Sequence, residues 1–326
     1  MTLNRRAFMG AAAALGLSHW APAWARQDRQ WPTRPVTIIV PYPPGGSSDI
    51  IARLVSQHLG EALKQTVVVE NKPGANGNLG AGLVVQSAKE GHTLLLCDVG
   101  ALAISPSVYT KLTFDPSTDL RAVSMLAYSP HVLAVHPDVP ANTVGELVEL
   151  SKKERVNFAV TAIGSAPHLA AVAVQEATGA KWDYVPYKGG AQALADTIGG
   201  QTHAIMNGLL ATLPHIRSGK LRAIAISKRE RMDLVKDIPT ISEQGVQGFE
   251  SGTWQGVMAP ASMPQETAER LAGILADIVK RPDISKQLGD QGAEIVTYPP
   301  DELSRFFNSE RERWAKVVQT AGVRLD

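Results

Sequence analysis

Apolar and polar residues alternate along this chain with two periods, one typical of strands and one typical of helices. Residues 36–40 form a short β-branched run, and after a Pro- and Gly-rich loop apolar residues recur at helical spacing over 50–59. Residues 67–70 and 93–97 are two further short apolar runs, with a helical pattern over 79–88 between them. Short strands that alternate with amphipathic helices predict βαβ units and therefore the α/β class.

The middle of the chain repeats this pattern after a long apolar run over 123–135, which Ser129-Pro130 interrupts. The run is longer than one strand of a single lobe needs, so we interpret it as a crossover. A new helix is predicted to begin at Thr143-Val144-Gly145-Glu146. The segments that follow predict strands over 157–160, 183–186, 203–206 and 221–226, and helices from about residues 167, 191 and 209.

A second extended stretch, 249–258, precedes a C-terminal region that is almost entirely helical. The helices are predicted over 265–280, 282–289 and 300–321. The simplest interpretation is that lobe 1 comprises 26–128 plus 252–326 and lobe 2 comprises 129–251. Two extended crossovers between two α/β lobes form a hinge, and the cleft between the lobes is the natural ligand site.

The first 25 residues have the three parts of an export signal. A charged start, Asn4-Arg5-Arg6, is followed by an apolar run from Ala7 to Leu17 and by the small-x-small end Ala23-Trp24-Ala25. The apolar run is too short to span a bilayer. We expect a signal peptide over 1–25 and a periplasmic protein. The paired arginines resemble the twin-arginine variant, and the choice between the Tat and Sec routes stays open.

Charge and composition exclude several classes of partner. Without Arg5 and Arg6 the chain keeps 30 of its 32 basic residues against 31 acidic ones, a net charge of −1. A near-neutral chain lacks the basic face that nucleic acid requires, and no later stretch reaches the ~20 apolar residues of a membrane span. We therefore expect no nucleic acid, no stable membrane insertion and a monomer. The lone Cys97 ends an apolar run and is predicted to be a buried thiol.

The loop between the first strand and the first helix is the most informative segment. Its glycines let backbone N–H groups turn inward, its serines add donors, and the following helix start adds unpaired N–H groups and a positive dipole end. We predict an anion cradle that can hold one carboxylate without an arginine. The alternative is a plain turn capped by Asp49. The candidate residues are Tyr42, Pro44, Gly45, Gly46, Ser47, Ser48 and Asp49.

Other loops that follow strands offer further polar groups. Gly164, Ser165 and His168 precede or begin a predicted helix, as do Tyr187, Lys188 and Gly189 in a second glycine-bearing loop. The alternative to a binding role is a surface position for His168 and Lys188. For Trp254 it is ordinary packing. The remaining candidates are Asn76 in a Pro-Gly/Asn-Gly turn, Asn207, and Trp254 in the second extended stretch.

Signatures of catalysis are absent from the sequence. There is no Gly-x-Ser-x-Gly elbow, no His-Glu-x-x-His, no cysteine cluster and no close acidic pair with a companion base. His131 and His136 lie on opposite faces of an extended segment, so they do not form a shared metal site. We predict a binding protein with no enzyme activity, no cofactor and no metal. A periplasmic hydrolase is the less favoured alternative.

Several of these segments together resemble the Bug family, the extracytoplasmic receptors of tripartite tricarboxylate transporters. The resemblance covers essentially the whole mature chain. It rests on Tyr42-Pro43-Pro44-Gly45-Gly46-Ser47-Ser48-Asp49, Glu70-Asn71-Lys72-Pro73-Gly74-Ala75, Gly164-Ser165-x-x-His168-Leu169, Val185-Pro186-Tyr187-Lys188-Gly189-Gly190, Ile238-Pro239-Thr240, Trp254-x-Gly256 and Ala259-Pro260.

This resemblance implies a type II periplasmic-binding-protein fold, or Venus flytrap. It implies that the first loop, Gly45 to Asp49, holds a ligand carboxylate and that loops of the other lobe select the rest of the ligand. It also implies transient delivery to transporter membrane subunits. The chain departs from the family pattern at Val160-Thr161-Ala162, which favours a more apolar wall there. A ligand-presenting sensor module for a membrane receptor is the alternative that the same fold would serve.

Overall fold

One mixed β-sheet connects all the strands that the structure describes. The computed structural model describes residues 31–87, 91–322 and 324–325, so the predicted signal peptide lies outside it. The chain divides into two units between Thr33 and Arg34, and every described helix and strand lies in the second unit, residues 34–326. The strands are β1 (Val36–Val40), β2 (Val67–Asn71), β3 (Thr93–Asp98), β4 (Leu120–Val135), β5 (Val156–Val160), β6 (Trp182–Pro186), β7 (Ala204–Gly208), β8 (Arg222–Ile226), β9 (Gly252–Pro260) and β10 (Glu294–Ile295).

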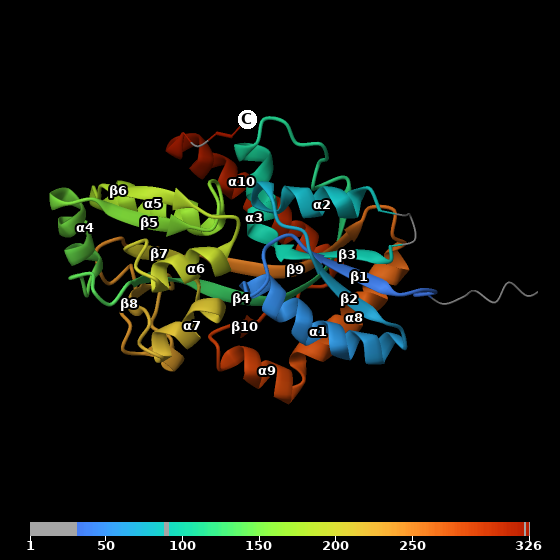
Figure 1. The fold of residues 1–326 in the computed structure, drawn as a ribbon. Helices are drawn as coiled ribbons and strands as arrows, with labels where there is room; N and C mark the ends of the chain where they lie inside the picture. The colour runs from blue at the N-terminus through green and yellow to red at the C-terminus, as the bar shows by residue number, and fades with distance from the viewer. Residues whose placement is uncertain (1–30, 88–90, 323, 326) are drawn as a thin grey trace, which may run out of the picture. The chain divides into compact units, whose positions relative to one another are not determined.

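Helices connect these strands and cover the sheet (Figure 1). They are α1 (Ser47–Leu63), η1 (Ala75–Gly77), α2 (Asn78–Val85), α3 (Val99–Val108), α4 (Val144–Lys153), α5 (Ala166–Thr178), α6 (Gly190–Ile198), α7 (Leu209–Arg217), η2 (Asp233–Val235), α8 (Gln265–Lys280), α9 (Pro282–Gly289) and α10 (Pro300–Ala321). Among the described helices, none is both long enough and apolar enough to cross a membrane.

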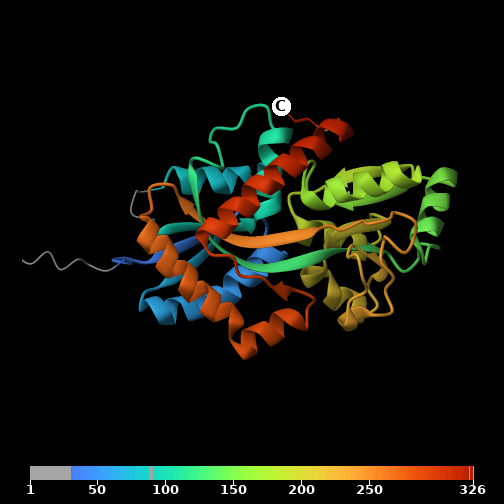
Figure 2. The ribbon, with the colours of Figure 1, turned by 180° about the vertical axis from the view of Figure 1, so that it is seen from behind.

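Two long strands, β4 and β9, connect two groups of parallel strands. The strand order is β2-β1-β3-β9-β4-β7-β5-β6, and β8 and β10 also pair with β4. β1 is parallel to β2 and β3 in the first group, and β5 is parallel to β6 and β7 in the second. Figures 1 and 2 show β4 and β9 side by side between the two groups. This arrangement confirms the predicted two-lobed α/β fold with two crossovers.

Strand β4 is continuous where the sequence suggested an interruption. From Leu120 to Pro130 it pairs with β9, and from His131 onward it pairs with β7. Pro130, which has no N–H to donate, therefore lies where β4 changes its partner. The lobe boundaries at 128/129 and 251/252 stay a prediction.

Each lobe has its own apolar core. Leu133, Phe158 and Met206 belong to the core of the second lobe, and Ile39, Leu95 and Met258 to that of the first. A smaller cluster joins the lobes: Trp314 and Val318 of α10 pack with Val108 of α3 and Leu169 of α5. The predicted burial of Cys97 is confirmed.

Candidate functional site

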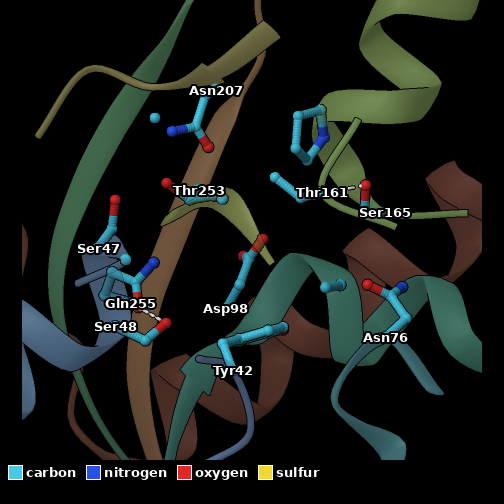
Figure 3. A pocket seen from close by; sticks show the side chains of 15 residues that line it. Tyr42, Ser47, Ser48, Asn76, Asp98, Thr161, Ser165, Asn207, Thr253 and Gln255 are labelled. Carbon is cyan, nitrogen blue, oxygen red and sulfur yellow. Dashed lines mark hydrogen bonds between the residues drawn. The ribbon is translucent and has the colours of Figure 1, made fainter. Parts of the chain in front are cut away.

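A small cavity opens where loops of both lobes meet, and its volume, measured as the space open to the centre of a water molecule, is about 60 Å³. Figure 3 shows Ser47, Asn207 and Thr253 on one side of the cavity. Thr161, Ser165 and Asn76 lie on the other side. The lining residues are Tyr42, Gly46, Ser47, Ser48, Asn76, Asp98, Ala101, Thr161, Ser165, Pro167, Gly190, Asn207, Gly208, Thr253 and Gln255.

Five helices begin at the wall of this cavity. Glycines 46, 189 and 208 are the N-cap residues of α1, α6 and α7, and glycine has no side chain that could cap its own helix. At α7, Ser129 Oγ accepts the N–H of Leu210 at 3.0 Å, so this helix start is partly engaged. The first N–H groups of a helix have no partner within the helix, and they carry the positive end of its dipole. Three helix starts of this kind provide a ready-made site for an anion.

The other two helix starts are closed by their own side chains. Asp98 Oδ1 accepts the N–H of Gly100 at 3.0 Å at the start of α3. Ser165 Oγ accepts the N–H of His168 at 3.3 Å at the start of α5. The donors available to a ligand are therefore concentrated at α1, α6 and α7, the helices with glycine caps.

The first loop owes its shape to Gly45 and Asp49. Gly45 has φ +86°, a conformation that favours glycine, whereas Gly46 has φ −81° and does not need to be glycine for its backbone. The Asp49 carboxylate accepts the Gly45 N–H at 2.9 Å and pairs with Arg53 at 3.0 Å. Burial raises the pKa of Asp49, but the hydrogen bonds from Arg53, Gly45 and Asn71 outweigh burial and hold it below its usual value. Asp49 thus braces the loop and does not line the cavity.

Two glycines let polar side chains approach one another at the cavity wall. A Cβ atom on Gly208 would lie 3.0 Å from Ser47 Oγ and 3.1 Å from Thr253 Oγ1. A Cβ atom on Gly190 would lie 2.7 Å from Asn207 Oδ1. Both glycines therefore keep open a space that any other residue would fill.

The amide of Gln255 is oriented by a neighbouring serine. Ser48 Oγ donates to Gln255 Oε1 at 2.7 Å, and both side chains are buried. With its oxygen engaged, Gln255 directs its NH2 group toward the cavity (Figure 3). This arrangement adds a neutral donor beside the start of α1.

The loop before α5 presents hydroxyl groups, while its histidine points elsewhere. Of the three residues at this departure from the family pattern, Thr161 lines the cavity, and its Oγ1 donates to Ser165 Oγ at 2.9 Å. The more apolar wall expected here stays a prediction. His168 Nδ1 accepts the N–H of Gly164 at 3.1 Å, and its ring packs edge-on against Tyr184. Burial lowers the pKa of His168 to about 4. His168 is therefore neutral near pH 7, and its hydrogen bond to Gly164 supports the loop.

The loop before α6 and the aromatic residue of β9 also have structural contacts. Tyr187 donates its hydroxyl to Asp196 Oδ2 at 2.8 Å, and Lys188 is exposed. Gly189 lies so close to Pro43 that a Cβ atom would be 2.4 Å from Pro43 Cδ. The ring of Trp254 packs between Tyr128 and Phe306. These side chains surround the site without forming its wall.

Seven of the sixteen predicted site residues line the cavity, and nine lie around it. The seven are Tyr42, Gly46, Ser47, Ser48, Asn76, Ser165 and Asn207. The nine are Pro44, Gly45, Asp49, Gly164, His168, Tyr187, Lys188, Gly189 and Trp254. The contribution of each of them to ligand binding stays a prediction.

Eight further residues line the cavity and are not among the sixteen that the sequence predicts. Two of them, Asp98 and Gly208, end a strand and directly precede a helix, which is the signal that identified the other loops. The eight are Asp98, Ala101, Thr161, Pro167, Gly190, Gly208, Thr253 and Gln255.

Asp98 stands out among the lining residues because no lysine, arginine or histidine accompanies it. Its carboxyl accepts N–H groups of Gly100, Ala101 and Trp254. Burial nevertheless raises the pKa of Asp98 to about 7, because these hydrogen bonds only partly offset the loss of water. No group of three or more His, Cys, Asp or Glu residues that could hold a metal ion occurs in the described part of the chain.

Known proteins resemble the chain over most of its length. BugT of Bordetella pertussis is 36% identical over 298 residues, which cover 90% of this chain and 91% of BugT. The structure of R. palustris Rpa4515 with adipate is 33% identical, with a TM-score of 0.87, and the match covers 90% of this chain and 99% of that one. The periplasmic binding protein BugD matches with a TM-score of 0.86 and 32% identity over 90% of this chain and 99% of its own, which confirms the fold.

The family model of the tripartite tricarboxylate transporter family receptor matches residues 51–323. This range contains every described strand except β1, and most of the cavity lining except Tyr42, Gly46, Ser47 and Ser48. The chain therefore belongs to the family of tripartite tricarboxylate transporter receptors, as its resemblance to Bug proteins implied.

Proposed function

We propose that this receptor binds a small organic carboxylate in the cavity between its lobes. The observation that carries the proposal is the convergence of three glycine-preceded helix starts, α1, α6 and α7, on one cavity. Those of α1 and α6 have no side-chain cap, and at α7 Ser129 accepts one N–H group, that of Leu210. Hydroxyl and amide groups complete the wall. A relative 33% identical to this chain has been solved with adipate, a small dicarboxylate.

The strength of such a site is sufficient for a receptor. Each favourable helix start contributes about 0.3–2 kcal/mol to the binding of an anion. Each hydrogen bond to a charged group contributes about 1.5–3 kcal/mol. Two or three such bonds together with the dipoles approach the ~8 kcal/mol of micromolar binding. A carboxylate can therefore be held without a lysine or arginine.

Ligand binding is proposed to draw the two lobes together. The loop after β1 contacts lobe 2 through Pro43 at Gly189, and Asn76 Nδ2 donates to the carbonyl of Gly164 at 3.3 Å. These contacts connect loops that also contribute to the cavity wall. A ligand that bridges α1 with α6 and α7 stabilises the closed arrangement by its greater affinity for it.

Export and delivery complete the proposed role. The signal peptide over 1–25 places the mature protein in the periplasm, and the closed receptor docks transiently on the membrane subunits of a tripartite tricarboxylate transporter. Two observations would establish this: location of the mature protein in the periplasmic fraction, and carboxylate uptake that requires both the receptor and these subunits. Uptake that persists without the receptor would contradict the role in delivery.

The binding site is tested by calorimetry with linear carboxylates of two to eight carbons. Gly208→Val places methyl groups between Ser47 and Thr253, so we expect at least a thirty-fold loss of affinity. Gly273→Ala is the matched control, because a Cβ atom there meets nothing within 4 Å. A wild-type protein that binds none of these carboxylates below 1 mM would overturn the proposal.

A further inference from the structure

We propose that Asp98 selects carboxylates that also carry a hydrogen-bond donor, a hydroxyl or ammonium group, over dicarboxylates of the same length. This inference rests on the proposed function, because it concerns the second recognition point of the same ligand. The carboxylate of the ligand lies at the glycine-capped helix starts. Its donor faces Asp98.

The position of Asp98 suits this role. It ends β3, precedes α3, and its carboxyl points into the cavity between the wall of Ser48 and Gln255 and the wall of Thr161 and Ser165 (Figure 3). Only 4% of the residue is exposed, so it faces the cavity and not bulk solvent.

Backbone groups fix the carboxyl, which above its pKa of about 7 is ionised and can only accept hydrogen bonds. Asp98 Oδ1 accepts the N–H groups of Gly100 and Trp254, each at 3.0 Å, and Ala101 adds a third backbone donor. An ionised carboxylate has about four acceptor positions and no hydrogen to donate. The hydrogen bonds from Gly100 and Trp254 both reach Oδ1, so the carboxyl is oriented and has acceptor positions left for a donor in the cavity.

The charges around the cavity indicate which ligand group takes that position. Asp98 forms none of the ion pairs in the described part of the chain. No lining side chain is basic. A second ligand carboxylate opposite an ionised Asp98 would place two acceptors and two like charges together. A hydroxyl supplies the missing hydrogen, and an ammonium group also supplies the opposite charge.

Helix capping alone does not account for an aspartate at this position. Asparagine and serine cap helices about as well as aspartate, and neither brings a buried charge. A buried carboxylate without a cation is costly to keep in a folded protein. A ligand that donates a hydrogen bond or a positive charge to Asp98 would offset this cost of burying the carboxylate.

The test compares ligands of equal length. For each chain of three to six carbons, calorimetry at pH 8 measures the α,ω-dicarboxylate and the monocarboxylates with a hydroxyl or an amino group, at either the second or the last carbon. We expect wild type to bind the best donor-bearing ligand at least ten-fold more tightly than the dicarboxylate of that length. A larger preference for the amino than for the hydroxyl compound identifies an ammonium group as the partner.

Asp98→Asn provides the decisive variant. Asparagine keeps the shape and the cap but replaces one oxygen with an NH2 donor, so the preference should reverse: the dicarboxylate gains affinity and the amino compound loses at least ten-fold. Asp138→Asn removes the same charge at a side chain that is 91% exposed and should change nothing. Thermal unfolding of the ligand-free variants verifies that they are folded.

The outcomes separate this inference from the proposed function. If carboxylates bind to wild type and Asp98→Asn changes every affinity by less than two-fold, the role of Asp98 is refuted while the receptor function stands. A wild-type preference for dicarboxylates at pH 8 also refutes it. If no carboxylate binds to wild type, both proposals fail.

Discussion

At the scale of single residues, Asp98 shows how a binding site can cost stability. Its burial raises its pKa to about 7, and the Glu310 carboxylate acts in the same direction. The neighbouring Tyr42 and Cys97 have pKa values raised mainly by burial, so both stay neutral near pH 7. The folded protein therefore holds a proton on Asp98 under conditions in which the unfolded chain releases it.

This proton makes stability depend on pH in a defined direction. Between the ordinary pKa of 3.8 and about 7, folding takes up the proton, so the free energy of unfolding decreases as the pH rises. The change is up to about 1.4 kcal/mol per pH unit. Asp98→Asn removes the group, so its melting temperature relative to wild type should be higher at pH 8 than at pH 5. Circular dichroism at both pH values measures this, and an equal difference at the two would contradict it.

Single residues are also where sequence analysis was least able to define the site. The glycine pair after β6 was identified, but Gly189 was chosen as the site residue, and the structure places Gly190 at the cavity and Gly189 against Pro43. Which of two adjacent glycines faces a ligand depends on the loop of the other lobe. Asp98 was missed for a related reason, since strand β3 was predicted to end at Cys97 and no helix was predicted after it.

At the scale of elements, amphipathic helices were predictable and fully buried ones were not. α8, α9 and α10 begin and end where the sequence predicts, because each has one apolar and one polar face. α3 was not predicted, because most of its residues are buried and its apolar residues therefore show no helical period. The missing helix is the one whose start contains Asp98.

The start of α4 allows a prediction that separates folding from binding. Thr143 Oγ1 accepts the N–H of Glu146 at 3.1 Å, and the Glu146 carboxylate accepts the N–H of Asn142 at 2.6 Å, a variant of the capping box. Thr143→Ala should lower the free energy of unfolding by about 1 kcal/mol. Urea unfolding measures the loss, and Thr143→Ser is expected to retain the cap. Carboxylate affinity should stay unchanged, because none of these residues lines the cavity.

At the scale of the whole molecule, the two crossovers were predictable and the contacts between loops of the two lobes were not. Long apolar runs indicated β4 and β9, because strands buried on both faces contain few polar residues. The contact between Pro43 and Gly189 joins residues far apart in the sequence, and neither local pattern indicates it. Contacts of this kind depend on how the lobes approach one another.

Gly189 is the N-cap residue of α6 but does not itself line the cavity, so its contact with Pro43 allows lobe closure to be tested. Gly189 has an extended backbone, φ 172°, so alanine causes no local strain, but its Cβ atom would lie 2.4 Å from Pro43 Cδ. Gly189→Ala should destabilise the closed form alone.

The apparent ligand affinity of Gly189→Ala should fall by the factor by which the closed form is depleted, and we expect this factor to be about ten. The ligand-free protein can relieve the contact by opening, so its melting temperature should stay close to that of wild type. Small-angle scattering should show a smaller ligand-induced decrease in the radius of gyration. If Gly189→Ala binds the ligand as tightly as wild type, and its radius of gyration decreases as much on binding, the lobes do not close on this contact.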